Sequence, residues 1–328
     1  MDFAQAGFYS SSMTSVQTLP PPAEPGTFLG FPLCLDISRL EADIAILGIP
    51  YGDPYGVAQV SNDQSRAPAA IRRESHDLTL GLDHWDFDLG GPLLDDRPVR
   101  VVDCGDVPAD RDDLKAHYRT AETVARAIFD SGAALVTLGG DHGIPIPVFR
   151  ALDNQGPITL VHIDAHLDWR DEVDGVREGY SSPIRRAAEL EHVGQIFQIG
   201  LRAQGSARRG EVEDALAYGA RLITASDLHR RGMTDVLNEI PDGGTYYLTI
   251  DADGVDPGIM PAVAAPAPGG VLYPQLHELI HGLAGKGRFI GMDIVEITPG
   301  RDLNGITCIT AGQLILNFIG VTARAMCP

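Results

Sequence analysis

Clusters of aspartate and histidine follow three short apolar runs of the sequence, and these are the residues best suited to do chemistry. The first cluster is Asp141 and His142, directly after two glycines. The second is the run Asp-Ala-His-Leu-Asp at 164–168, and the third is Asp-Ala-Asp at 251–253. Burying several carboxylates beside apolar residues costs much free energy unless cations or hydrogen bonds compensate them. The motifs contain no set of lysines or arginines, so bound divalent cations are the expected compensation.

The spacing of these residues favours a site for two such ions. In extended backbone, residues i and i+2 point the same way, so the polar residues of 164–168 can converge, and those of 251–253 likewise. Four aspartates match the charge of two divalent ions, and a donor set rich in oxygen with two imidazoles favours Mn²⁺ first and Ni²⁺ second. Co²⁺ and Fe²⁺ are further options, and Zn²⁺, which prefers fewer and softer ligands, stays open. We therefore predict the following metal ligands: His142, Asp164, His166, Asp168, Asp251 and Asp253.

Each motif also has a purely structural interpretation. Gly-Gly-Asp-His alone is weak evidence because Gly-Gly is a turn signal, and a single Asp-Ala-Asp is often a solvated turn. The run at 164–168 is stronger, since three hydrophilic side chains directly after an apolar strand make a poor core. The three motifs together favour the metal interpretation. His162 is expected to support a ligand by hydrogen bonding or to lie in the core, and Asp141 and Asp256 to be supporting or turn residues.

The elements that would position these clusters are short strands rich in β-branched residues, with helical patterns between many of them. Near-continuous apolar runs are typical of parallel strands that are covered on both faces. The expected strands lie at 43–48, 99–105, 134–140, 158–164, 195–200, 221–224, 246–251 and 289–295. The expected helices lie at 114–132, 182–193, 207–219, 273–286 and 305–320.

This alternation predicts an α/β fold: a three-layer α/β/α sandwich around a central, mostly parallel sheet of about eight strands. In such sheets, ligands bind beyond the carboxyl ends of the strands, which is where the three clusters fall. Residues 1–40 are rich in Ser, Thr, Pro and Gly and are expected to form an N-terminal arm, either a loose tail or an oligomer contact. Residues 41–328 are expected to form a single catalytic domain.

Composition limits the possible partners. The formal net charge of −20 disfavours binding to nucleic acids and anionic membranes, and it is compatible with a cationic substrate. The four cysteines are far apart and form no CxxC pair, which is typical of reduced cysteines in a cytosolic protein. The N-terminus lacks the pattern of a signal peptide, and no stretch is expected to approach the ~18 apolar residues that span a bilayer. We therefore expect a cytoplasmic protein.

The motifs resemble those of the ureohydrolase (arginase and agmatinase) family, in its agmatinase-like branch. The resemblance covers roughly residues 43–320 and rests on GGDH at 139–142, DAHLD at 164–168, DADGVDP at 251–257 and PAPGG at 266–270. It implies an arginase-like fold and one metal held by His142, Asp164, Asp168 and Asp251. It implies a second metal held by Asp164, His166, Asp251 and Asp253, with a hydroxide between the ions. The reaction would be attack of this hydroxide on a guanidinium carbon, with release of urea and an amine.

The resemblance also implies roles for other residues. Glu296 would engage the substrate guanidinium, and Asp253 or Asp164 would transfer the proton. Tyr180 takes the place of a histidine that family members are proposed to use as a proton shuttle, so another group would shuttle protons or the leaving amine would need less help. We expect Tyr180 and Trp169 to contact the substrate. The residues around Trp169 and Arg170, and the segment PAVAAPAPGG at 261–270, depart from the usual family pattern.

These departures leave the substrate open. Agmatine, a small cationic guanidino compound, is the default substrate because the resemblance is to the agmatinase-like branch of the family. The alternatives are guanidinobutyrate, formimidoylglutamate, and small guanidines or biguanides such as guanidine, dimethylguanidine and metformin, with nickel as the metal for the last group. A non-catalytic partner subunit of a hetero-oligomeric ureohydrolase is a further alternative, although all six predicted ligands are intact. A single-zinc amide hydrolase resembling histone deacetylases is disfavoured by the two bridging aspartates. The resemblance further implies a homo-oligomer, a trimer or hexamer.

Overall fold

One parallel sheet forms the centre of the molecule. The computed structural model describes residues 18–22, 26–52, 54–56, 63–108 and 113–327. The eight strands lie in the order β2-β1-β3-β8-β7-β4-β5-β6, and every neighbouring pair is parallel. The strands are β1 (Ile44–Ile49), β2 (Val101–Asp106), β3 (Ala134–Gly139), β4 (Ile158–Ile163), β5 (Val193–Leu201), β6 (Arg221–Thr224), β7 (Thr245–Asp251) and β8 (Arg288–Val295).

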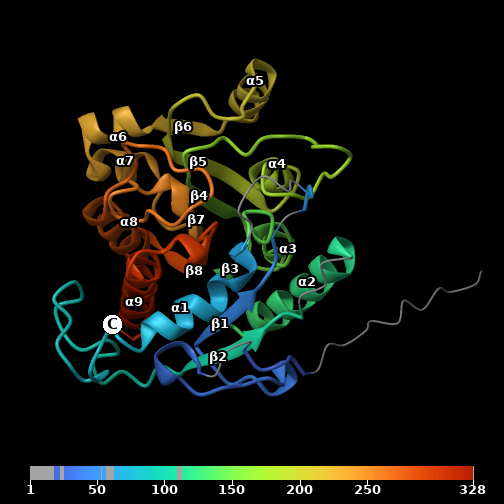
Figure 1. Ribbon diagram of the computed structural model, residues 1–328. Coiled ribbons are helices and arrows are strands. Elements are labelled where there is room, and N and C mark those ends of the chain that lie inside the picture. The colour runs from blue at the N-terminus through green and yellow to red at the C-terminus, as the bar shows by residue number, and fades with distance from the viewer. Residues whose placement is uncertain (1–17, 23–25, 53, 57–62, 109–112, 328) are drawn as a thin grey trace, which may run out of the picture.

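Helices cover both faces of the sheet, as Figure 1 shows. The helices are α1 (Ala67–Ser75), α2 (Leu114–Asp130), α3 (Pro145–Arg150), α4 (Pro183–Ala188), α5 (Arg209–Tyr218), α6 (Ala225–Arg231), α7 (Met233–Glu239), α8 (Tyr273–Lys286) and α9 (Ile306–Met326). Short 3₁₀ turns lie at Phe28–Gly30, Ile37–Arg39, Asp63–Arg66, Ala252–Gly254 and Pro299–Arg301.

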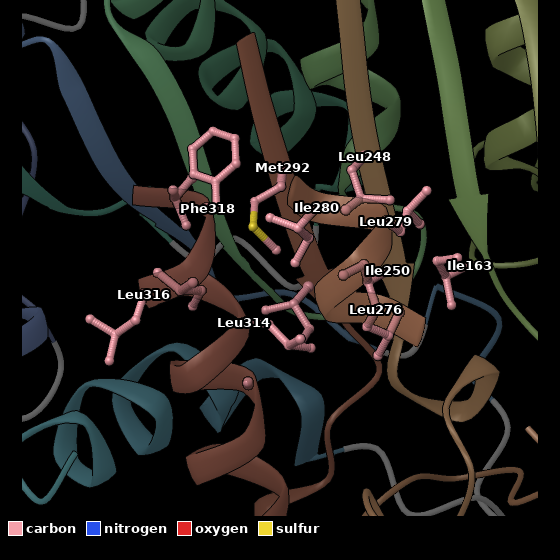
Figure 2. Packing of buried hydrophobic residues seen from close by; sticks show 14 of the residues in the cluster. Ile163, Leu248, Ile250, Leu276, Leu279, Ile280, Met292, Leu314, Leu316 and Phe318 are labelled. Carbon is pink, nitrogen blue, oxygen red and sulfur yellow. The ribbon is translucent and has the colours of Figure 1, made fainter. Parts of the chain in front are cut away.

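Two apolar cores separate the layers. On one face, α1 and α6–α9 pack against the sheet, and Figure 2 shows Leu276 and Ile280 of α8 meeting Leu248 and Ile250 of β7. On the other face, residues of α2–α5 pack against the alternate side chains of the same strands. Because successive strand residues point to opposite faces, burial of both faces requires the near-continuous apolar strands seen in the sequence. The predicted three-layer sandwich is confirmed, and its sheet is parallel throughout.

The eight predicted strands are confirmed, and the helices differ in extent. The helix expected at 182–193 ends at Ala188, because the chain turns there and enters β5 at Val193. The last helix continues to Met326. The short helices α1, α3, α6 and α7 were not predicted. Proline lies in the first turn of α1 and α3, where its missing N–H costs nothing, and a Pro-rich segment is easily mistaken for a loop.

The last helix corrects one expectation. By length and composition α9 is apolar enough to cross a membrane, whereas no such stretch was expected, but 83% of its apolar window is buried inside the protein. Within the predicted arm, the described residues include Phe28 and Phe31, which lie in the core beside α1, so this part of the arm is not a loose tail. Residues 1–17 of the arm lie outside the described residues.

Candidate metal centre

The three acidic motifs meet at the carboxyl edge of four neighbouring strands. His142 follows β3, Glu296 follows β8, Asp251 ends β7, and the 164–168 run follows β4. These strands are adjacent in the order β3-β8-β7-β4, so residues far apart in the sequence come together. The structure thereby brings all six predicted metal ligands into two contacting groups.

The first group surrounds the imidazole of His142. Its Nδ1 lies 3.1 Å from Asp164 Oδ2, 3.0 Å from Asp168 Oδ2 and 3.1 Å from Asp251 Oδ2. The His142 side chain is buried, and Nδ1 has no hydrogen-bond partner in the part of the chain that the structure describes. Neighbouring ligands of an octahedral cation with bonds of ~2.1 Å lie about 3.0 Å apart, so the spacing fits a shared divalent ion.

The second group surrounds His166. Its Nδ1 lies 3.2 Å from Asp253 Oδ2 and 3.4 Å from Asp164 Oδ1. Asp164 therefore offers one carboxylate oxygen to each imidazole, which is the arrangement a bridging ligand needs. Asp251 faces His142 with Oδ2, while its Oδ1 accepts a hydrogen bond of 2.7 Å from the Asp253 N–H. The side chain of His166 is 23% exposed, so this group lies nearer the solvent than His142.

The charges of this pocket call for cations. Burial and the neighbouring Asp164 raise the pKa of Asp168 to about 7, and burial with repulsion from Asp253 raises the pKa of Asp251 well above its ordinary value. Hydrogen bonds to Asp164 and Asp253 raise the pKa of His166 to about 12. Burial lowers the pKa of His142, but its three carboxylate neighbours outweigh burial and raise it. The pocket thus attracts positive charge, either as protons or as metal ions, and its donor set fits two divalent cations.

His162 lies close enough to be mistaken for a ligand. Together with His142, Asp164 and Asp168 it offers donor atoms that all lie within 4.8 Å of one another. However, the Gln198 amide donates to Leu167 O at 2.7 Å and to His162 Nδ1 at 3.1 Å, so Nδ1 carries no proton. The proton of the neutral ring is then on Nε2, which donates to Asp164 Oδ2 at 2.8 Å. His162 therefore orients a carboxylate, as the sequence had suggested.

Glu296 is held in place by two donors. Its Oε1 accepts from the His142 backbone N–H at 2.8 Å, and its Oε2 accepts from Gln64 Nε2 at 2.9 Å. Burial raises the pKa of Glu296, and this effect is larger than the lowering of the pKa by the two hydrogen bonds. Its φ is +64°, a left-handed conformation that costs a non-glycine residue about 1 kcal/mol or more. Asp168 has a φ of +50°, so two of the predicted site residues have strained backbone.

Glycines allow the chain to pass closely behind the cluster. A Cβ on Gly140 would lie 2.2 Å from Tyr51 O, and one on Gly254 would lie 2.5 Å from Asp164 N. Neither neighbour is a flexible side chain, so larger residues would displace the turns that carry His142 and Asp253. These two glycines belong to the GGDH and DADGVDP motifs. The motifs are therefore constrained by packing as well as by chemistry.

The other predicted residues have different positions. Tyr180 is partly buried, and its ring packs edge-on against Tyr55 at 4.6 Å between centroids. Trp169 is 3% exposed and packs in the core beneath α4 and α5, where it contacts Tyr218. These contacts are those of a packing residue. The predicted contact of Trp169 with the substrate is not tested by them and stays a prediction. Asp256 accepts hydrogen bonds from the backbone of Gly258, Gly269 and Gly270, and Asp141 Oδ1 accepts one from Gly143.

Sequence reasoning missed a set of polar residues that support the cluster. Arg202 donates to the carbonyl oxygens of Gly200, Asp253, Gly254, Val255 and Ala267, so its guanidinium ties the Asp253 turn to the PAPGG segment. The remaining residues are Gln64, Gln198, Thr249 and Asp293. The last three interrupt otherwise apolar strands, and this interruption is the signal that could have identified them.

Comparisons with known proteins agree with this geometry. The family model described as "Arginase family" matches residues 42–320. Guanidinobutyrase of Pseudomonas aeruginosa is 31% identical over 302 residues, which cover 90% of this chain and 91% of that protein. Agmatinase of Citrobacter koseri is 29% identical, with 90% of this chain and 92% of that protein covered. The solved structure of proclavaminate amidino hydrolase from Streptomyces clavuligerus has a TM-score of 0.78 and 28% identity, and covers 93% of this chain and 99% of that chain.

Proposed function

Because the chain belongs to the arginase family and is a hydrolase of guanidino C–N bonds, we propose that it hydrolyses agmatine to urea and a diamine. The observation that supports this most directly is the pair of imidazole–carboxylate groups that share Asp164. A hydrolase of this kind needs a water made nucleophilic at neutral pH, and a buried anionic pocket at the edge of the sheet can hold the cations that do this.

The proposed ligand sets are those that the family resemblance implies, and most of them agree with the contacts. One divalent cation would be held by His142, Asp164, Asp168 and Asp251, which meet at His142. The other would be held by Asp164, His166 and Asp253, which meet at His166, together with Asp251. Mn²⁺ is proposed first and Ni²⁺ second, because oxygen donors with two imidazoles suit these ions. When bound, the cations supply a water of lowered pKa and polarise the substrate.

The chain's own residues would bind the substrate and move protons. Among the described residues, each carboxylate oxygen of Glu296 accepts one hydrogen bond, which leaves each with a lone pair that the substrate guanidinium can approach. Asp253 is 5% exposed and Asp164 is fully buried, so Asp253 is the better placed to pass a proton to the leaving amine. Tyr180, held against Tyr55, would line the path of the substrate side chain.

The choice of agmatine rests on the charges beside the cluster. A guanidino acid needs a free cation for its carboxylate, whereas agmatine carries a second positive charge. Of the arginines described near the cluster, Arg170 pairs with Glu211 at 2.6 Å and donates to Ser206 O at 2.7 Å. Arg202 is engaged with backbone carbonyls. Both are already bonded, which favours the amine. Guanidinobutyrate is the second candidate, because guanidinobutyrase is a relative at 31% identity.

The test is urea release across a guanidino panel. The metal-free protein is reloaded with Mn²⁺ or Ni²⁺ separately and given agmatine, guanidinobutyrate, arginine, guanidine, dimethylguanidine and metformin. Turnover of agmatine with the highest kcat/KM supports the proposal. Cleavage of guanidinobutyrate with agmatine untouched would replace the substrate, and absence of urea from every compound would refute the function.

The assembly and location are proposed on the family resemblance. We expect residues 41–328 to act as one catalytic domain within a cytoplasmic homotrimer or homohexamer. Light scattering coupled to size-exclusion chromatography measures the mass directly, and a monomer that is fully active would contradict the oligomer.

A further inference from the structure

A row of buried polar side chains crosses the sheet directly beneath the metal centre. Thr137, Asp293, Thr249, His162 and Gln198 are register partners on β3, β8, β7, β4 and β5. All five are completely buried. Register partners in a parallel sheet point to the same face, and the row lies two residues before Asp164 on β4 and before Asp251 on β7. The row therefore forms the floor of the acidic pocket.

Hydrogen bonds within this row determine which nitrogen of His142 carries a proton. The Thr249 hydroxyl donates to Asp293 Oδ1 at 2.6 Å, because an ionised carboxylate only accepts. The same hydroxyl lies 3.2 Å from His142 Nε2 and has no second proton to give, so it accepts from an Nε2–H. In the neutral ring Nδ1 then has a free lone pair, which faces the three carboxylates.

The opposite tautomer would defeat metal binding. With its proton on Nδ1, His142 would donate to Asp164, Asp168 or Asp251 and occupy the position where a cation would bind. Those carboxylates attract that proton strongly, since they lie 3.0–3.1 Å away. An acceptor at Nε2 is therefore needed to hold the proton on that nitrogen. Among the described residues, the Thr249 hydroxyl bonded to Asp293 is the acceptor at this position.

We propose that Thr249 and Asp293 are a positioning pair that holds His142 as the Nε2–H tautomer and thereby sets the affinity of the cation site on the His142 side. This rests on the proposed function, since it assumes that the cluster holds two cations. The pair touches neither substrate nor cation. His166 has no corresponding partner among the described contacts, so the pair acts on one of the two sites.

The test is cation retention in four full-length variants, three at threonines and one at Asp293. Thr249→Val keeps the shape of the side chain and removes the hydroxyl, Thr249→Ser keeps the hydroxyl, and Thr137→Val makes the same change on the other side of Asp293. Protein loaded with Mn²⁺ is dialysed against a series of chelator concentrations, and bound manganese per chain is measured by elemental analysis. Supporting residues of metal ligands typically change affinity by about 10–100-fold.

We expect Thr249→Val to lose one of its two cations at a chelator concentration about 10–100-fold lower than the wild type requires, and to retain the other cation. Thr249→Ser and Thr137→Val should retain both as the wild type does. Asp293→Asn probes the pair from its other end and should weaken the same cation, so the proposal stays testable if Thr249→Val does not fold.

Equal retention in Thr249→Val, Asp293→Asn and the wild type would overturn the positioning pair and leave the proposed function intact. Equal loss in Thr249→Val and Thr249→Ser would also overturn it, because shape and not the hydroxyl would then matter. A wild-type protein that binds no divalent cation would instead refute the proposed function itself.

Discussion

Replacing Asp168 by asparagine should change the stability of the protein in opposite directions with and without cations. Asp168 is buried against Asp164 and Asp251, and all three face His142. In the absence of cations its negative charge is repelled, so the neutral amide should stabilise the fold. In the loaded protein the carboxylate neutralises a cation, so the amide should destabilise it.

The magnitude follows from the pKa of Asp168, which burial and Asp164 raise from 3.8 to about 7. At about 1.36 kcal/mol for each pH unit, this corresponds to roughly 4 kcal/mol of destabilisation once the group is charged in both states. The hydrogen bond and the charge of His142 already lower this pKa, so the value includes their offset. A gain of this size would raise the melting temperature by up to about 6 °C.

The sign follows from linkage. Below about pH 4 Asp168 is protonated in the folded and unfolded states, and the substitution should have no effect through its charge. Between the ordinary value of 3.8 and about 7 the folded state holds a proton that the unfolded state has lost, so the stability of the metal-free wild type falls as pH rises. The advantage of Asp168→Asn should therefore grow from pH 4 to 7 and stay constant above.

The assay is urea-induced unfolding of metal-free and Mn²⁺-loaded protein between pH 5 and 8. Asp174→Asn is the matched control, because Asp174 is on the same loop, is also left-handed at φ +51°, and is exposed. It should change neither form. If Asp168→Asn destabilised the metal-free protein as much as the loaded one, Asp168 would be a structural residue and not a ligand.

Three further substitutions separate binding, substrate contact and structure. Asp251→Ala should lower urea release by at least about 100-fold and bring the melting temperature down to that of metal-free protein, and unchanged activity would remove Asp251 from the site. Glu296→Gln should lower kcat/KM by about 10–100-fold while both cations stay bound, as for the loss of one charge-assisted hydrogen bond; full activity would exclude the guanidinium contact. Arg72→Met should destabilise the fold by about 3–5 kcal/mol in urea unfolding, since it removes the buried cation that Asp103 and Asp106 share, with no change in cations bound per chain.

The strands and the acidic cluster were readable from the sequence for the same physical reason. A parallel strand covered on both faces must be apolar throughout, so an aspartate or histidine at its end stands out. Strand ends that share one edge of the sheet then bring residues such as His142 and Asp251 together. That pairing depends on the strand order, which places β8 between β3 and β7, and no local pattern specifies this order.

The residues that the sequence did not identify act through contacts that only the tertiary fold creates. Gln64 precedes an unpredicted helix and reaches Glu296, which is 232 residues away along the chain. In the sequence Arg202 looks like an ordinary surface arginine, and only the tertiary fold brings its guanidinium to the backbone of the Asp253 turn. Trp169 directly follows a predicted ligand, yet it packs in the core, and the left-handed backbone at Asp168 separates the two positions.

The most direct test of the central claim is the number of divalent cations in active protein. Elemental analysis of a fully active preparation should find about two divalent cations per chain, with manganese expected ahead of nickel as the metal. Urea release should fall in proportion as a chelator removes these cations. Full activity in a preparation shown to contain no metal would contradict the account, whatever the substrate.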